Sequence, residues 1–109
     1  MRMAFYGTLR PGGENHYEVR SIAGTWHRAT VRGWVYDITW GPADGYPGIT
    51  LDAGAPPTDV DVLDSDELEN HLRRLDDFEG PGYRRIEVDV TLEDGSQTTA
   101  WIYEADPEA

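Results

Sequence analysis

The sequence contains no cysteine, no lysine and no long run of apolar residues. Without cysteine, the chain can form neither a disulfide framework nor a thiolate metal site. Its apolar runs are too short to cross a membrane, and its first residues lack the basic region and apolar segment of a secretory signal. A soluble, cytoplasmic protein is therefore the default expectation.

Negative charge dominates the composition. The chain has 21 acidic residues against nine basic ones, all of them arginine, for a net charge of −12. Such a field repels nucleic acid and anionic membrane surfaces, so neither is expected as a partner. His16, His27 and His71 are scattered, and the carboxylates match no calcium loop, so no metal site is predicted. The sequence does not indicate an oligomeric state.

At 109 residues the chain has the size of one domain with a modest core. We assign residues 1–104 to this domain and residues 105–109 to an acidic tail, with fraying expected from Glu104 onward. The sequence contains neither internal repeats nor low-complexity segments.

Several stretches alternate apolar and polar residues with the period of two that is typical of a half-buried strand. The longest, Thr25–Asp37, contains Gly33, where a bend or bulge is expected. The predicted strands are 1–6, 25–37, 48–51, 59–63, 85–92 and 97–103, the last two joined as a hairpin. With one main helix and a short second helix over 14–22, these strands predict an α+β fold. A curved, mostly antiparallel sheet or a small barrel fits them.

The main helix is predicted over residues 68–79. Asp64 before it is the expected N-cap, and Glu67 three residues later completes a capping box. Gly80 provides the C-terminal stop, and Pro81 prevents the helix from continuing.

One carboxylate lies in an unusual place on this helix. Leu68, Leu72 and Leu75 form a single apolar stripe, and the next step of four along it reaches Glu79. A glutamate at a helix end is more often solvated, and the helical pattern alone favours that reading. If Glu79 is buried, however, burial and the negative end of the helix dipole both raise its pKa toward neutrality. A general base or acid needs such a pKa, so Glu79 is a candidate catalytic residue.

The loop after the first predicted strand, Tyr6-Gly7-Thr8-Leu9, is the second candidate. Gly7 lets the chain turn so that successive N–H groups point into one concavity, which suits a carboxylate or an oxyanion. A glycine and threonine after a strand also form ordinary turns, and Arg10 is equally compatible with a simple surface charge. The loop by itself is therefore a weak signal.

Four segments, taken in chain order, strengthen both candidates. They are Phe5–Gly12 with Asn15–His16, Gly33–Asp37 with Tyr46–Gly48, Leu75–Gly80 with Tyr83–Arg85, and Trp101–Tyr103. The first contains Tyr-Gly-Thr-Leu, and the third contains Leu-Asp-Asp-Phe-Glu-Gly followed by Tyr-Arg-Arg. In this order the segments resemble the gamma-glutamylcyclotransferase-like family, and the likeness covers essentially the whole chain.

The resemblance implies a small mixed barrel with flanking helices, and it implies roles for individual residues. Tyr6, Gly7, Thr8 and Leu9 match the family's substrate-binding loop, and Glu79 matches its catalytic glutamate. The implied reaction converts a small gamma-glutamyl compound to 5-oxoproline and a free amine or amino acid. Glu79 then acts as base and afterwards as acid, and the chemistry requires neither metal nor cofactor.

Two points stay open within this resemblance. Tyr83 and Arg85 share a strand face opposite Ile86, so they either shape the edge of the site or pack there. The segment between Gly80 and Tyr83 is short, whereas some cyclotransferases that act on gamma-glutamyl amines carry a longer insert. The resemblance therefore does not determine which amine departs from the substrate. A non-catalytic module that captures a small ligand or a peptide end is the alternative function, because a fold does not prove an activity.

Overall fold

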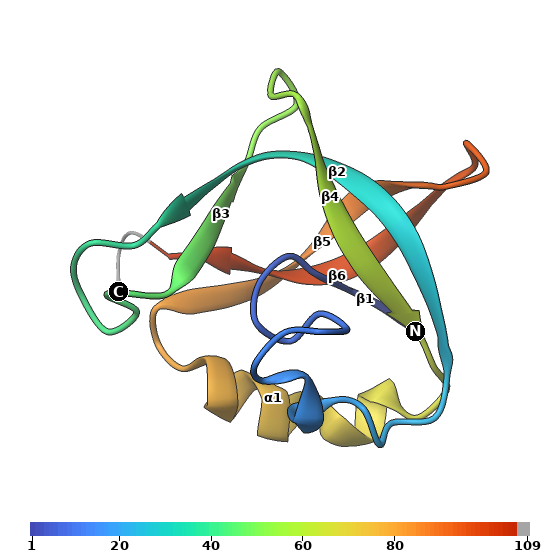
Figure 1. Cartoon of the computed structure of the whole chain (residues 1–109), viewed down its shortest axis with the longest axis horizontal. Helices are drawn as coiled ribbons and strands as arrows, with labels where there is room; N and C mark the ends of the chain where they lie inside the picture. The colour runs from blue at the N-terminus through green and yellow to red at the C-terminus, as the bar shows by residue number, and fades with distance from the viewer. Residues whose placement is uncertain (107–109) are drawn as a thin grey trace.

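The computed structural model describes residues 1–106, which form a mixed sheet curled into a barrel with helical segments along one side (Figure 1). The strands are β1 (Arg2–Phe5), β2 (Thr25–Asp37), β3 (Pro47–Leu51), β4 (Pro57–Asp64), β5 (Tyr83–Leu92) and β6 (Gln97–Ala105). The helical segments are the 3₁₀ turns η1 (His16–Glu18) and η2 (Leu68–His71) and the helix α1 (Leu72–Glu79).

Five of these strands close the barrel. The sheet order is β3-β2-β4-β1-β6-β5, and β5 also pairs with β2, which completes a ring of β2, β4, β1, β6 and β5. β3 lies outside this ring and pairs with the C-terminal part of β2. β1 runs parallel to β6, and the other pairs are antiparallel. The predicted small, mixed and mostly antiparallel barrel is confirmed.

The long strand β2 has the predicted bounds and pairs with three strands. Residues 25–32 pair with β4, residues 29 and 30 also pair with β5, and residues 33–37 pair with β3. Gly33 therefore marks the change of partner. A Cβ atom at Gly33 would lie 2.9 Å from Ile49 Cδ1, so the approach of β3 requires a glycine here.

The main helical region covers the predicted residues but is not one continuous helix. Its first turn from Leu68 is 3₁₀, and the α-helix begins at Leu72. Gly80 ends α1 as predicted. Its φ is 77°, a value that favours glycine, and its N–H donates to the carbonyl of Asp76 at 3.0 Å.

The predicted capping box at Asp64 and Glu67 is wrong. β4 continues through Asp64, whose carboxylate pairs with Arg2 Nε at 3.3 Å, so it is engaged on the sheet. The residue before η2 is Glu67, and no side chain caps the helix there. Ser65 instead stabilises the turn that precedes η2, because its Oγ accepts a hydrogen bond from the Glu67 N–H at 3.0 Å.

The helix predicted over 14–22 is reduced to the single turn η1. Its N-terminal residues bind the loop after β1. The N–H and the side-chain amide of Asn15 donate to Thr8 O and Oγ1, both at 3.0 Å. His16 Nδ1 lies 2.9 Å from Leu9 O. This segment therefore supports the loop rather than continuing as a helix.

β6 is longer than predicted. Glu104 is buried in it at 5% exposure, and its carboxylate accepts hydrogen bonds from Arg84 Nη2 at 2.7 Å and from the Leu51 N–H at 2.8 Å. Glu104 and Ala105 thus belong to the sheet, and the fraying predicted from Glu104 onward is wrong for both, because these bonds and the pairing with β5 hold the strand in place. Residues 107–109 of the predicted tail lie outside the described residues.

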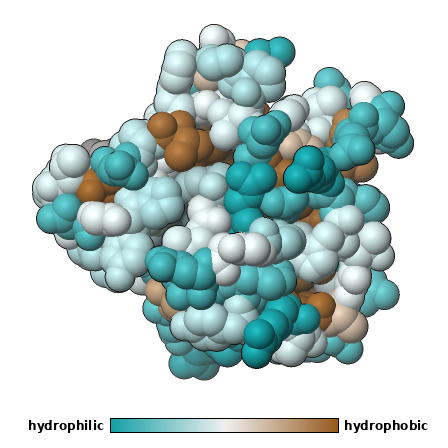
Figure 2. Space-filling model, in the orientation of Figure 1, coloured by the Kyte–Doolittle hydropathy of each residue, from teal (hydrophilic) through white to brown (hydrophobic). Residues whose placement is uncertain are grey.

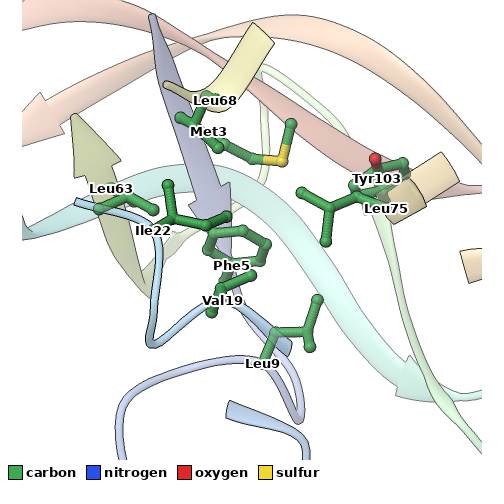
Figure 3. Close-up of a cluster of buried hydrophobic side chains, with 9 residues drawn as sticks. All are labelled: Met3, Phe5, Leu9, Val19, Ile22, Leu63, Leu68, Leu75 and Tyr103. Atoms are coloured by element: carbon green, nitrogen blue, oxygen red, sulfur yellow. The ribbon is translucent and has the colours of Figure 1, made fainter. Parts of the chain in front are cut away.

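Two apolar clusters form the core, one inside the barrel and one between the barrel wall and the helical segments. Alternation along β1 places Ala4 in the first cluster and Met3 and Phe5 in the second. In the second cluster, Leu75 of α1 lies beside Tyr103 of β6 (Figure 3). The apolar stripe of the helix therefore faces the barrel wall.

Leu75→Ala is expected to lower the free energy of unfolding by about 2–5 kcal/mol, the range for truncating a buried leucine. Leu75 is 0% exposed, and the truncation leaves a cavity against Tyr103. Leu72→Ala is the matched control on the same helix, with a smaller loss expected because Leu72 packs only at the edge of the cluster. Urea denaturation measures both variants, and equal losses would contradict the burial pattern.

The face seen in Figure 2 is mostly hydrophilic, with small and separate apolar patches. Within residues 1–106, no helix has the length and apolar character needed to span a membrane.

Candidate functional site

A small pocket lies where β1 and β6 end and β3 and β5 begin, next to the C-terminus of α1. Its cavity volume is about 40 Å³, room for a few water-sized groups and so for the end of a small molecule. Glu79 and the loop residues Gly7, Thr8 and Leu9 all line it. The structure thus brings together the two stretches that the sequence singles out, which lie far apart along the chain.

Glu79 is the last residue of α1 and is partly buried at the pocket. Burial raises the pKa of its carboxyl to about 7, because removal from water disfavours the ionised form. Among the described residues, no group donates a hydrogen bond to this carboxylate. A proton acceptor that titrates near neutrality is therefore available to a ligand.

The loop after β1 presents its backbone to the same pocket. Gly7 O accepts from the Arg10 N–H at 3.3 Å, and Thr8 O accepts from the Asn15 N–H at 3.0 Å. In a planar trans peptide the N–H points opposite to the carbonyl, so the N–H groups of Thr8 and Leu9 point away from these partners. Neither N–H donates to another residue in the described part of the chain. Both remain available for an anionic group.

Three tyrosines complete the wall, and each uses its hydroxyl hydrogen elsewhere. Tyr6 donates to the carbonyl of Tyr103 at 2.7 Å, and Tyr83 donates to the carbonyl of Pro47 at 2.6 Å. Tyr103 donates to Asp76 Oδ1 at 2.7 Å. Burial, with smaller contributions from Glu79 and other groups, raises the pKa of all three and brings that of Tyr83 to about 12. All three therefore stay neutral at physiological pH.

The two predicted edge residues separate. Tyr83 lines the pocket, whereas Arg85 is not among its lining residues. The Arg85 guanidinium binds Asp76 through Nε at 2.9 Å and Nη2 at 3.2 Å, and it lies 5.2 Å from the centre of the Trp101 ring. Arg10 also lies away from the pocket, in an ion pair with Asp61 at 2.7 Å.

Pro47, Tyr103 and Asp76 contribute to the site or its support, and sequence reasoning assigned them no role. Pro47 and Tyr103 line the pocket, and Asp76 binds the hydroxyl of Tyr103. All three lie inside the four motif segments, and this was the sequence feature that could have identified them. The motifs did not show that Tyr103 connects β6 to α1.

Comparison with known proteins identifies the family of this chain. Residues 3–109 match the family model described as "Gamma-glutamyl cyclotransferase, AIG2-like". The match spans nearly the whole chain, and the chain therefore belongs to the AIG2-like gamma-glutamyl cyclotransferase family.

Individual relatives are more distant. Gamma-L-glutamyl-butirosin B gamma-glutamyl cyclotransferase from Niallia circulans is 29% identical over 103 residues, which are 90% of this chain and 62% of that protein. The chain thus spans about three fifths of that relative. The crystal structure of YkqA from Bacillus subtilis is 27% identical with a TM-score of 0.72, covering 96% of this chain and 35% of YkqA.

An AIG2-like protein from Mus musculus has the same fold. Its crystal structure aligns with a TM-score of 0.63 at 24% identity, over 98% of this chain and 80% of the mouse protein. At this identity the likeness supports the fold alone.

Proposed function

We propose that this chain converts a gamma-glutamyl amine or gamma-glutamyl amino acid to 5-oxoproline and a free amine, with Glu79 as the general base and then the general acid. The observation that carries the proposal is the pocket itself. Glu79, Thr8 and Leu9 all line it, and among the described residues neither the Glu79 carboxylate nor the N–H groups of Thr8 and Leu9 have a hydrogen-bond partner.

The reaction needs a proton acceptor and a polarised carbonyl. The α-amine of the substrate attacks its own γ-amide carbonyl, which forms the ring C–N bond and then breaks the bond to the departing nitrogen. Glu79 removes a proton from the α-ammonium group so that the neutral amine can attack. The two protons that this nitrogen loses in all pass through Glu79 to the departing nitrogen, which leaves as an ammonium ion, so protons balance without water or a redox partner. Holding amine and carbonyl together contributes up to ~7–11 kcal/mol in favourable intramolecular systems.

The loop supplies the anionic subsite. In this proposal the N–H groups of Thr8 and Leu9 bind the substrate's α-carboxylate or the oxyanion that develops on the γ-carbonyl. Gly7 has no side chain, so the loop can approach Pro47 closely. Tyr6 and Leu9 line the pocket wall. Tyr83 shapes the opposite edge.

The amine half of the substrate is expected at the open side of the pocket. The relative from Niallia circulans acts on gamma-L-glutamyl-butirosin B, which supports a gamma-glutamyl amine as one candidate. The net charge of −12 also favours the approach of a cationic substrate over an anionic one.

A panel assay tests this function. The protein is incubated with gamma-glutamyl amines and gamma-glutamyl dipeptides whose leaving groups are cationic, neutral or anionic, and 5-oxoproline is quantified. We expect release from at least one substrate, with cationic leaving groups preferred. Binding of panel compounds without any release of 5-oxoproline would reject the enzymatic function and support the binding module. In a binding module, the partly buried Glu79 would have no evident role.

The activity is expected to rise with pH through neutrality. Glu79 accepts a proton only when ionised, and its pKa is about 7, so kcat/KM should increase about tenfold between pH 6 and pH 8. A pH profile with an active panel substrate measures this limb. A wild-type profile that is flat from pH 6 to 8 would contradict the assignment.

A further inference from the structure

Asp76 fastens the end of α1 to the sheet. Its carboxylate accepts two hydrogen bonds from Arg85 on β5, at 2.9 and 3.2 Å, and one from the Tyr103 hydroxyl on β6, at 2.7 Å. The main-chain carbonyl of Asp76 also accepts the N–H of Gly80 at 3.0 Å, so the same residue fixes the last helical turn. Glu79 lies in that turn.

Tyr103 extends this connection to the other side of the pocket. Its side chain is 4% exposed and reaches Asp76, while its carbonyl accepts the hydroxyl of Tyr6 at 2.7 Å. Tyr6 directly precedes the Gly7 loop. One hydrogen-bonded chain therefore runs from the loop through β6 to the helix that carries Glu79.

The charges around Glu79 are balanced by the same contacts. Asp76 lies one helical turn before Glu79, and Arg85 neutralises it through two hydrogen bonds. From the other elements of the described chain, the phenols of Tyr6, Tyr83 and Tyr103 interact with Glu79, and Tyr36 and Tyr46 interact with Tyr83. Asp77 on α1 is exposed to solvent.

We propose that Asp76, Arg85 and Tyr103, here called the Asp76 clasp, are positioning residues that hold Glu79 at the pocket and keep the charge beside it balanced. This inference rests on the proposed role of Glu79 as general base. None of the three needs to exchange a proton with the substrate. Their contribution is the placement of the Glu79 carboxylate and the charge next to it.

The clasp predicts opposite electrostatic effects for its two charged members. Arg85→Gln leaves the Asp76 carboxylate unpaired, and a nearby negative charge disfavours ionisation of Glu79. Asp76→Asn leaves the guanidinium unpaired, which favours ionisation. The midpoint of the acid limb should therefore move up in Arg85→Gln and down in Asp76→Asn. Tyr103→Phe changes no charge and should leave the midpoint in place.

Turnover should fall in all three variants, because each loosens the end of α1. We expect kcat to fall roughly 10- to 100-fold with a smaller change in KM, the pattern of a misplaced catalytic group. The double variant Asp76→Asn/Arg85→Gln is neutral, so its midpoint should return to the wild-type value while its kcat stays low. Arg74→Gln is the control, since Arg74 is on the same helix and its ion pair with Glu18 at 2.9 Å lies away from the pocket.

The experiment measures pH profiles of kcat and kcat/KM on the full chain, together with an NMR pH titration of the Glu79 carboxyl in each variant. The titration needs no substrate, so it tests the clasp even if no panel compound is turned over and the proposed function fails. Opposite shifts with a low kcat in the neutral double variant would support the clasp. Shifts in the same direction, no shift, or an unchanged kcat in Tyr103→Phe would overturn it. If Asp76→Asn does not fold, Arg85→Gln and Tyr103→Phe still decide.

Discussion

Glu79→Gln is expected to reduce turnover by roughly 10²–10⁴-fold, the range for removing an acid–base residue. Glutamine keeps the size and shape of the side chain but cannot accept the proton from the attacking amine. KM should change little, because the N–H groups of Thr8 and Leu9 and the pocket wall remain. Steady-state assay of 5-oxoproline release and calorimetric titration of the variant with its unreacted substrate measure the two effects. Wild-type turnover in this variant would remove Glu79 from the mechanism.

The stability of Glu79→Gln provides a control for folding. Because the pKa of Glu79 is raised to about 7, the folded chain holds a proton that the unfolded chain releases between about pH 4.5 and 7. Stability contributed by this group therefore falls as pH rises through that window. At pH 8 the wild-type protein contains a buried carboxylate, which Glu79→Gln replaces with a neutral amide. The variant should unfold at the same or a higher urea concentration, so lost turnover cannot be assigned to lost folding.

Gly7→Val is expected to lower kcat/KM by roughly 10²-fold or more, through displacement of the loop. A Cβ atom at Gly7 would lie 3.0 Å from Pro47 Cγ, and the two methyl groups of valine add further bulk at the pocket. The backbone of Gly7 is not in the left-handed region, so crowding rather than backbone strain is the cause. The assay for 5-oxoproline, with KM and kcat determined separately, measures the loss.

Gly54→Val is the matched control for this substitution. Gly54 also lacks a left-handed backbone, and a Cβ atom there would make only an ordinary contact of 3.4 Å with Asp52 Oδ1. Gly95 is less suitable, because its φ of 88° would strain any side chain. Equal activity of Gly7→Val and Gly54→Val would show that the Gly7 loop does not have to approach Pro47.

The strands were predictable because their residues alternate in a way that burial on one face explains. β2 has the predicted bounds, and the hairpin of β5 and β6 follows the predicted pattern. The helix N-terminus was not predictable in detail, because Asp64 is a good capping residue by type. In the structure Asp64 ends β4 and pairs with Arg2, a residue 62 positions earlier in the chain, so it is not available to cap the helix.

In the candidate site, too, some residues were predictable from the sequence and others were not. Glu79 was visible as a polar residue on an apolar stripe, and the Gly7 loop was visible as a glycine after a strand. The roles of Tyr103 and Asp76 were not visible, because their hydrogen bond joins residues 27 positions apart. The bond from Tyr6 to the Tyr103 carbonyl spans 97 positions. Local patterns carry no information on such partners, which only the packed barrel brings together.

The pairing between β2 and β5, here called the seam, is short, and this affects how the barrel opens locally. The two strands pair at Ala29 with Leu92 and at Thr30 with Thr91, and the Glu93 N–H donates to the Arg28 carbonyl at 3.1 Å beside them. In contrast, β5 and β6 pair continuously from Tyr83 to Thr91. Local opening favours regions with few backbone hydrogen bonds, so amide protons at this seam should exchange with solvent sooner than those of β5 and β6. At about 3.3 Å per residue, the seam lies roughly 30 Å along β5 from Tyr83. We therefore expect the end of the barrel remote from Glu79 to open locally more often than the continuously paired length of β5 and β6.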